Sequence, residues 1–229
     1  MGTEAAASKT LGVVVVGQSP RPDIVAQLRA VIPADIAIEL RGALDGMSRG
    51  DIDRIKPANG YDALFTRLPG GEAVKISKQA VERGALGAVD ALAAQGVTAI
   101  MMCCTGDFPL LEGQGAVVLP SAVLAGMVHG LLPRGRLGLF VPISDQVGTL
   151  DQKWRREGIE IVSVPMTPGC GELELDGAVE QMQALSPDLV VLDCMSYTQA
   201  TKDRVRMRLR APVILGITAA ARVVSELVA

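Results

Sequence analysis

The chain has 229 residues, of which 49% are hydrophobic and 21% charged, and its formal net charge is −3. This length and apolar content suit one large domain or two small ones. The negative charge and an aromatic content of only 3% argue against a nucleic-acid-binding protein, which needs a basic surface or exposed rings.

No stretch reaches the roughly 20 apolar residues that span a bilayer, so no membrane partner is expected. Residues 1–9 contain no secretory signal and read as a frayed tail. We therefore expect a cytoplasmic protein whose cysteines stay reduced.

Short apolar runs alternate with helical patterns along the chain, which is typical of an α/β protein with parallel sheets. Ser48 with Asp51 three residues later indicates a capped short helix. The predicted strands are residues 11–17, 35–40, 62–66, 97–103, 137–142, 159–164 and 189–193. The predicted longer helices are residues 23–32, 77–95, 145–157 and 177–185.

Both halves end in the same way: a cysteine loop, a short strand and a helix of small residues. These closing pairs are residues 116–119 with 121–132, and 212–215 with 219–227. The repeated order predicts two pseudo-symmetric lobes, with a single continuous sheet as the alternative. The predicted division is 1–112 for the lobe carrying Cys104, 113–210 for the lobe carrying Cys194, and 211–229 for a C-terminal strand and helix returning to the first lobe.

Cys104 and Cys194 each follow a buried strand, where ligands bind in open parallel sheets. The start of a following helix would lower the pKa of a thiol there. Two thiols facing each other over a cleft could take a proton from one side of a carbon and return it to the other side. The alternative is that both are small buried hydrophobes, the role that we assign to Cys103.

The other two chemistry-bearing residues suggest no metal site. Cys170 has no counterpart in the repeat, and His129, the only histidine, lies inside a predicted helix. The cysteines follow no zinc-binding spacing, so no metal is expected. The loop after the first strand, GQSP, lacks the P-loop and GxGxxG motifs, so no cofactor is expected either.

Six segments occur in an order that is specific in combination: LGVVVVGQSPRPDI (11–24), GALD (42–45), TRL (66–68), CCTGDF (103–108), KW (153–154) and DCMSYT (193–198). Together they resemble the AroM family, which is similar to the aspartate/glutamate/hydantoin racemase superfamily. The resemblance covers nearly the whole chain from residue 11. It departs from the amino-acid racemases at CTG and DCM, where they carry Cys-Asn-Thr and Gly-Cys-Thr, which puts recognition of an α-amino group in doubt.

The resemblance implies two α/β lobes with the site in the cleft between them and Cys104 and Cys194 as opposed acid/base groups. Arg21 and Arg67 could each present a bidentate fork to a carboxylate, with a surface arginine as the alternative. For the neutral residues the alternatives are turn chemistry and local helix capping. The expected substrate-binding residues are Gln18, Ser19, Arg21, Arg67, Thr105, Gly106, Tyr197 and Thr198.

These residues predict a cofactor-independent racemase or isomerase acting on a small carboxylate-bearing molecule at the carbon next to the carboxylate. One alternative is an enzyme with a single working cysteine, either a nucleophilic isomerase or a decarboxylase. Another is a non-catalytic small-molecule binding protein linked to aromatic amino-acid metabolism. A homodimer stays open, since relatives are often dimers.

Overall fold

The computed structural model describes residues 9–113, 116–149 and 151–229, so the predicted tail lies almost wholly outside the described residues. The strands form two separate four-stranded parallel sheets, which confirms the two-lobed prediction over a single continuous sheet. The first sheet has the order β2 (Ala37–Gly42), β1 (Thr10–Val15), β5 (Ala99–Cys103), β6 (Val117–Val118). The second has the order β8 (Ile159–Pro165), β7 (Gly135–Val141), β9 (Leu189–Leu192), β10 (Val213–Leu215). Each strand thus has a counterpart at the same place in the other sheet.

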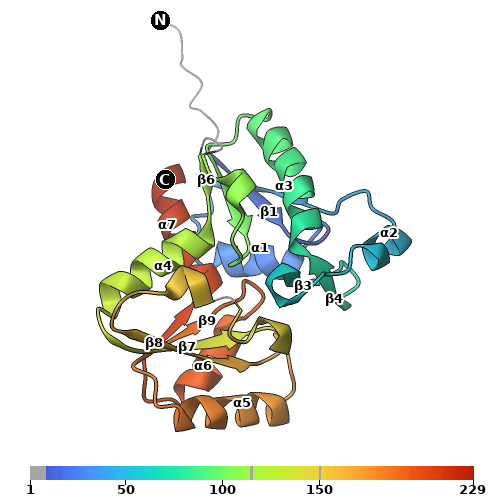
Figure 1. Cartoon of the computed structure of the whole chain (residues 1–229). Helices are drawn as coiled ribbons and strands as arrows, with labels where there is room; N and C mark the ends of the chain where they lie inside the picture. The colour runs from blue at the N-terminus through green and yellow to red at the C-terminus, as the bar shows by residue number, and fades with distance from the viewer. Residues whose placement is uncertain (1–8, 114–115, 150) are drawn as a thin grey trace, which may run out of the picture.

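Central strand β1 reads as an unbroken apolar run because both of its faces are buried. Val13 and Val15 belong to one core cluster, and Val14 and Val16 to another on the opposite face. Helices cover the two sheets (Figure 1). They are α1 (Pro22–Arg29), α2 (Arg49–Arg54), α3 (Lys78–Ala93), α4 (Pro120–Leu131), α5 (Glu172–Ala184), α6 (Gln199–Arg206) and α7 (Gly216–Val228).

Two helices cross from one half to the other. Helix α4 follows β6 of the first sheet, yet Leu124 and Val128 pack with Leu137 and Leu139 of the second sheet. Helix α7 follows β10 of the second sheet and packs against α1 and β5 of the first. The two crossing helices also contact each other, on the left of Figure 1. Because each half contributes a helix to the core of the other, the two halves are joined through their cores.

The crossing corrects the predicted positions of two short strands. Strand β6 pairs with β5, although residue 113 was predicted to begin the second lobe. Strand β10 pairs with β9, so only the helix of residues 211–229 returns to the first half. Strands of two or three residues carry too little pattern to indicate which sheet they join.

The helix predicted over 145–157 is wrong. This segment contains two 3-10 turns, η3 (Ser144–Gln146) and η4 (Asp151–Trp154). Residue 150 lies outside the described residues. Gly148 has a φ of 71°, in the left-handed region, and this conformation interrupts a helix.

An antiparallel hairpin replaces a further parallel strand. The strand predicted at 62–66 is β3 (Ala63–Arg67), and it pairs antiparallel with β4 (Ala73–Ser77), a strand that was not predicted. Short turns η1 (Gly60–Asp62) and η2 (Pro109–Leu111) precede β3 and follow β5. Helix α2 begins at the predicted capping pair, Ser48 and Asp51. Over the described part of the chain, no helix is both long enough and apolar enough to cross a membrane.

Candidate functional site

Both strand-end cysteines line one cavity between the two halves. Cys104 directly follows β5, and Cys194 lies two residues beyond β9, the strand in the equivalent position of the second sheet. The cavity offers about 30 Å³ to the centres of water molecules, within about 490 Å³ of space between atoms that includes open solvent. The smaller volume is room for about two waters, so a larger ligand must extend into the open part of the cavity or displace its wall.

Burial controls the protonation of both thiols. It raises the pKa of Cys104 to about 11. Two smaller effects lower that pKa: the hydrogen bond that the Gly106 amide donates to Sγ over 3.4 Å, and the nearby Lys153 cation. Burial also raises the pKa of Cys194 to about 12, against hydrogen bonds from Ser196. The predicted lowering of these pKa values is therefore wrong, because the cost of burying each charged thiolate outweighs the hydrogen bonds that favour it.

A buried ion pair lies beside the thiols. Lys153 Nζ is 3.0 Å from Asp193 Oδ1, and the two side chains are 7% and 0% exposed. The same ammonium donates to the carbonyl oxygen of Thr105, and the Thr105 hydroxyl donates to the backbone carbonyl of Asp193 over 3.1 Å. These bonds tie the loop of Cys104 to the loop of Cys194.

Three residues of the cavity wall each have a buried polar atom that has no hydrogen-bond partner within the described structure. These atoms are Thr66 Oγ1, Gln146 Oε1 and Asp193 Oδ2. None of the three was predicted to belong to the site. Thr66 and Asp193 lie inside the quoted TRL and DCM segments, which was the available signal, whereas Gln146 lies in no motif.

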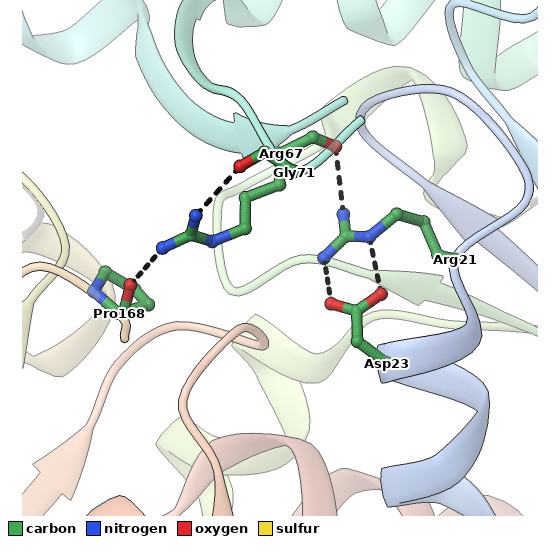
Figure 2. A network of polar contacts seen from close by, with 5 residues as sticks. All are labelled: Arg21, Asp23, Arg67, Gly71 and Pro168. Carbon is green, nitrogen blue, oxygen red and sulfur yellow. Dashed lines mark hydrogen bonds and ion pairs between the residues drawn. The ribbon is translucent and has the colours of Figure 1, made fainter. Parts of the chain in front are cut away.

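Thr105, Gly106 and Arg21 line the cavity, as expected for substrate-binding residues. Arg21 is 4% exposed, and its Nε and Nη2 donate to the two carboxylate oxygens of Asp23 over 2.8 and 2.6 Å. Figure 2 shows this bidentate pair. The fork that we expected to hold a substrate carboxylate is therefore turned toward a carboxylate of the protein itself.

Arg67 lies outside the cavity and joins the two halves. Its guanidinium donates to the carbonyl oxygens of Gly71 in the first half and Pro168 in the second (Figure 2). It also lies 5.8 Å from the ring centroid of Phe65. These contacts give Arg67 a bridging position.

Gln18 and Ser19 bind the neighbouring loop and do not line the cavity. Gln18 Nε2 donates to the carbonyl oxygens of Leu44 and Met47 over 3.1 and 2.9 Å. The Ser19 amide and hydroxyl both donate to the carboxylate of Asp45, over 2.7 and 2.8 Å. These bonds hold the loop after β1 against the loop after β2.

Tyr197 and Thr198 also lie outside the cavity wall. Tyr197 is fully buried, and its hydroxyl donates to the carbonyl oxygen of Met166. The Thr198 hydroxyl accepts a hydrogen bond from the Thr201 amide over 3.1 Å and caps α6. The local cap, the alternative considered for Thr198, is what the structure contains.

The remaining cysteines take the positions of packing or surface residues. Cys103 is buried in the main core and touches the cavity, whereas Cys170 is partly exposed and does not line it. Across the described residues, no cluster of histidine, cysteine, aspartate or glutamate side chains is arranged to hold a metal ion.

The family model of the AroM protein matches residues 11–228. The chain belongs to the AroM family. Among curated proteins, no sequence matches this AroM chain. Its fold is shared with solved racemases and with a decarboxylase, at identities that establish the fold alone.

Glutamate racemase from Francisella tularensis subsp. tularensis SCHU S4, solved in complex with D-glutamate, has a TM-score of 0.62 and 15% identity, over 97% of this chain and 81% of that one. Allantoin racemase from Klebsiella pneumoniae has a TM-score of 0.62 and 18% identity, over 96% and 87%. Arylmalonate decarboxylase has a TM-score of 0.58 and 18% identity, over 96% and 92%.

Proposed function

We propose that this AroM protein is a cofactor-independent racemase or isomerase that moves a proton at the carbon next to the carboxylate of a small acid. One observation carries the proposal: Cys104 and Cys194 line the same cavity from equivalent strand ends of the two sheets. Its free cysteines also suit the reducing cytoplasm, the location that we propose.

We assign the role of base to Cys104, because the Gly106 amide and the Lys153 cation both favour its thiolate. Cys104 must first lose its proton, against its raised pKa. The thiolate then takes the proton from the substrate carbon, and the bonding electrons move onto the carboxylate as an enolate. Cys194 then gives its S–H proton to the opposite side of that carbon, leaving Cys194 as thiolate and Cys104 as thiol.

Three of the expected binding residues remain candidates for holding the substrate, because they line the cavity: Arg21, Thr105 and Gly106. Arg21 contributes positive charge close to the thiols, although Asp23 occupies two of its nitrogens.

The raised pKa values favour a second candidate, a decarboxylase with one working cysteine. Burial holds both thiols protonated at neutral pH, and a protonated thiol is a proton donor. When carbon dioxide leaves, the electrons of the broken bond stay on the carbon, and the thiol supplies the proton that replaces it. Water then returns a proton to the thiolate.

Deuterium incorporation separates these candidates. The protein is incubated in deuterated water with 2-amino, 2-hydroxy and malonate-type acids, and the acids are analysed by NMR and chiral chromatography. For the racemase, Cys104→Ser and Cys194→Ser each lower racemisation by about 100-fold or more, whereas Cys170→Ser leaves it unchanged. A decarboxylase releases carbon dioxide and depends on one cysteine only. Binding that survives both Cys→Ser changes, with no turnover of any acid, identifies a binding protein.

A further inference from the structure

The cavity wall holds polar atoms that the protein itself leaves without partners. Among the described residues, Thr66 Oγ1, Gln146 Oε1 and Asp193 Oδ2 are buried and make no hydrogen bond. The three residues are 1%, 3% and 1% exposed, and all three line the cavity of the cysteines. Buried polar groups are costly unless they are paired, so three of them around one cavity leave hydrogen-bonding positions for water or a ligand to fill.

The bonds already present identify two of these atoms as acceptors. Gln146 Nε2 donates to the carbonyl oxygen of Ala63 over 2.8 Å. A carbonyl oxygen only accepts, so the amide nitrogen must face Ala63 and the amide oxygen is the free atom. Asp193 Oδ1 accepts a hydrogen bond from Lys153, and Oδ2 of the same carboxylate is the second acceptor. The Thr66 hydroxyl is able to donate or accept.

We infer that the cavity selects small acids carrying an N–H or O–H donor beside the reacting carbon, with Asp193 Oδ2 and Gln146 Oε1 as the acceptors. The inference rests on the proposed function only in taking the ligand to be a carboxylic acid. Lys153 acts as a positioning residue, because it holds Asp193 Oδ1 and leaves Oδ2 for the ligand.

The two acceptors distinguish acids by the hydrogen bonds that each acid can donate. An unsubstituted acid in the cavity leaves both acceptors unpaired, and an acid with a 2-oxo group places a further acceptor oxygen next to them. Each loses affinity relative to the hydroxy or amino acid of the same carbon skeleton.

Binding of two matched series to the wild-type protein, measured by calorimetry, tests the inference. One series is propionate, lactate, alanine and pyruvate, and the other is succinate, malate, aspartate and oxaloacetate. In at least one series, the hydroxy or amino acid is expected to bind about tenfold more tightly than the unsubstituted and oxo acids. If neither series shows this order, water satisfies the three atoms and the inference is wrong.

Asp193→Asn reverses the hydrogen-bonding character of the position. Lys153 only donates, so the new amide turns its oxygen toward Lys153 and its nitrogen toward the cavity. The preference for donor-bearing acids is then expected to fall about tenfold, with the oxo acid gaining affinity. Asp176→Asn is the matched control, because Asp176 is ion-paired with Arg208 away from the cavity and its loss leaves the preference unchanged.

Gln146→Met provides a second variant if Asp193→Asn does not fold, as judged by circular dichroism. It removes the other acceptor at similar volume, and the same loss of preference is expected. An unchanged preference in every folded variant overturns the inference. Because binding needs no turnover, a protein that keeps the preference but exchanges no deuterium refutes the proposed catalysis alone. Rapid deuterium exchange into the unsubstituted acids refutes this inference alone.

Discussion

The ammonium of Lys153 and the carboxylate of Asp193 lie 3.0 Å apart in a buried ion pair beside two thiols. Lys153 comes from turn η4, and Asp193 immediately precedes Cys194. The pair also reaches the carbonyl oxygen of Thr105, next to Cys104. One cation thus influences both halves of the site.

Lys153→Met is expected to destabilise the protein by about 3–5 kcal/mol, because it leaves the Asp193 carboxylate buried without its partner. Urea unfolding followed by circular dichroism measures the loss. The double variant with Asp193→Asn removes the uncompensated charge and should recover more than half of it. A single variant as stable as wild type would show that solvent reaches the pair.

The cavity thiols should react with iodoacetamide only as the pH rises. The thiolate is the reactive form, so below its pKa of about 11 the rate at Cys104 should increase about tenfold per pH unit. Mass spectrometry of alkylated peptides between pH 7 and 10 gives the rate, with Cys170 outside the cavity as internal reference. In Lys153→Met the loss of the cation raises the pKa of Cys104 further, so its alkylation at a given pH should be slower. Rapid alkylation of Cys104 at pH 7 would contradict its raised pKa.

Stability should fall in alkaline solution because of the same thiol. The pKa of Cys104 rises from 9.0 to about 11 on folding, so between these values the unfolded chain has released a proton that the folded chain keeps. The unfolded state then binds fewer protons, and the free energy of unfolding decreases as the pH rises through this window. The contribution of Cys104 is about 1–3 kcal/mol. Urea unfolding at pH 8, 9 and 10 should show a shallower decline for Cys104→Ser than for wild type, and parallel declines would refute the assignment.

Two glycines of α3 offer a matched comparison. A Cβ added at Gly84 would lie 1.9 Å from the carbonyl oxygen of Ala43, whereas one at Gly87 would meet no atom within 4 Å. Gly84→Ala should therefore cost about 1–3 kcal/mol through overpacking, and Gly87→Ala should stabilise the helix by about 0.5–1 kcal/mol. Thermal unfolding of the two variants measures the difference. Equal midpoints would mean that the loop of Ala43 moves away without cost.

The elements with strong local patterns could be predicted from the sequence. Strand β1 is a buried apolar run, and Ser48 with Asp51 forms the capping box that starts α2. The repeated order of elements predicted two sheets and placed Cys104 and Cys194 at strand ends, and both line the cavity.

The rest depended on contacts between distant segments. The pairing of β10 with β9 and the turn at η4 follow from tertiary packing, which overrides local pattern. Whether a polar side chain is free for a ligand depends on its partners in space. Arg21 is occupied by Asp23, while Gln146 keeps a free oxygen, and no motif distinguishes the two cases.

The packing of α7 onto α1 and β5 has a consequence for synthesis on the ribosome. Residues of α7 such as Ile217, Ala220 and Val224 share a core with Leu11 and Val13 of the first strand. The N-terminal half therefore cannot close its core until α7 has been synthesised and has left the exit tunnel. A nascent chain that stops before α7 would leave this part of the first core open to chaperones.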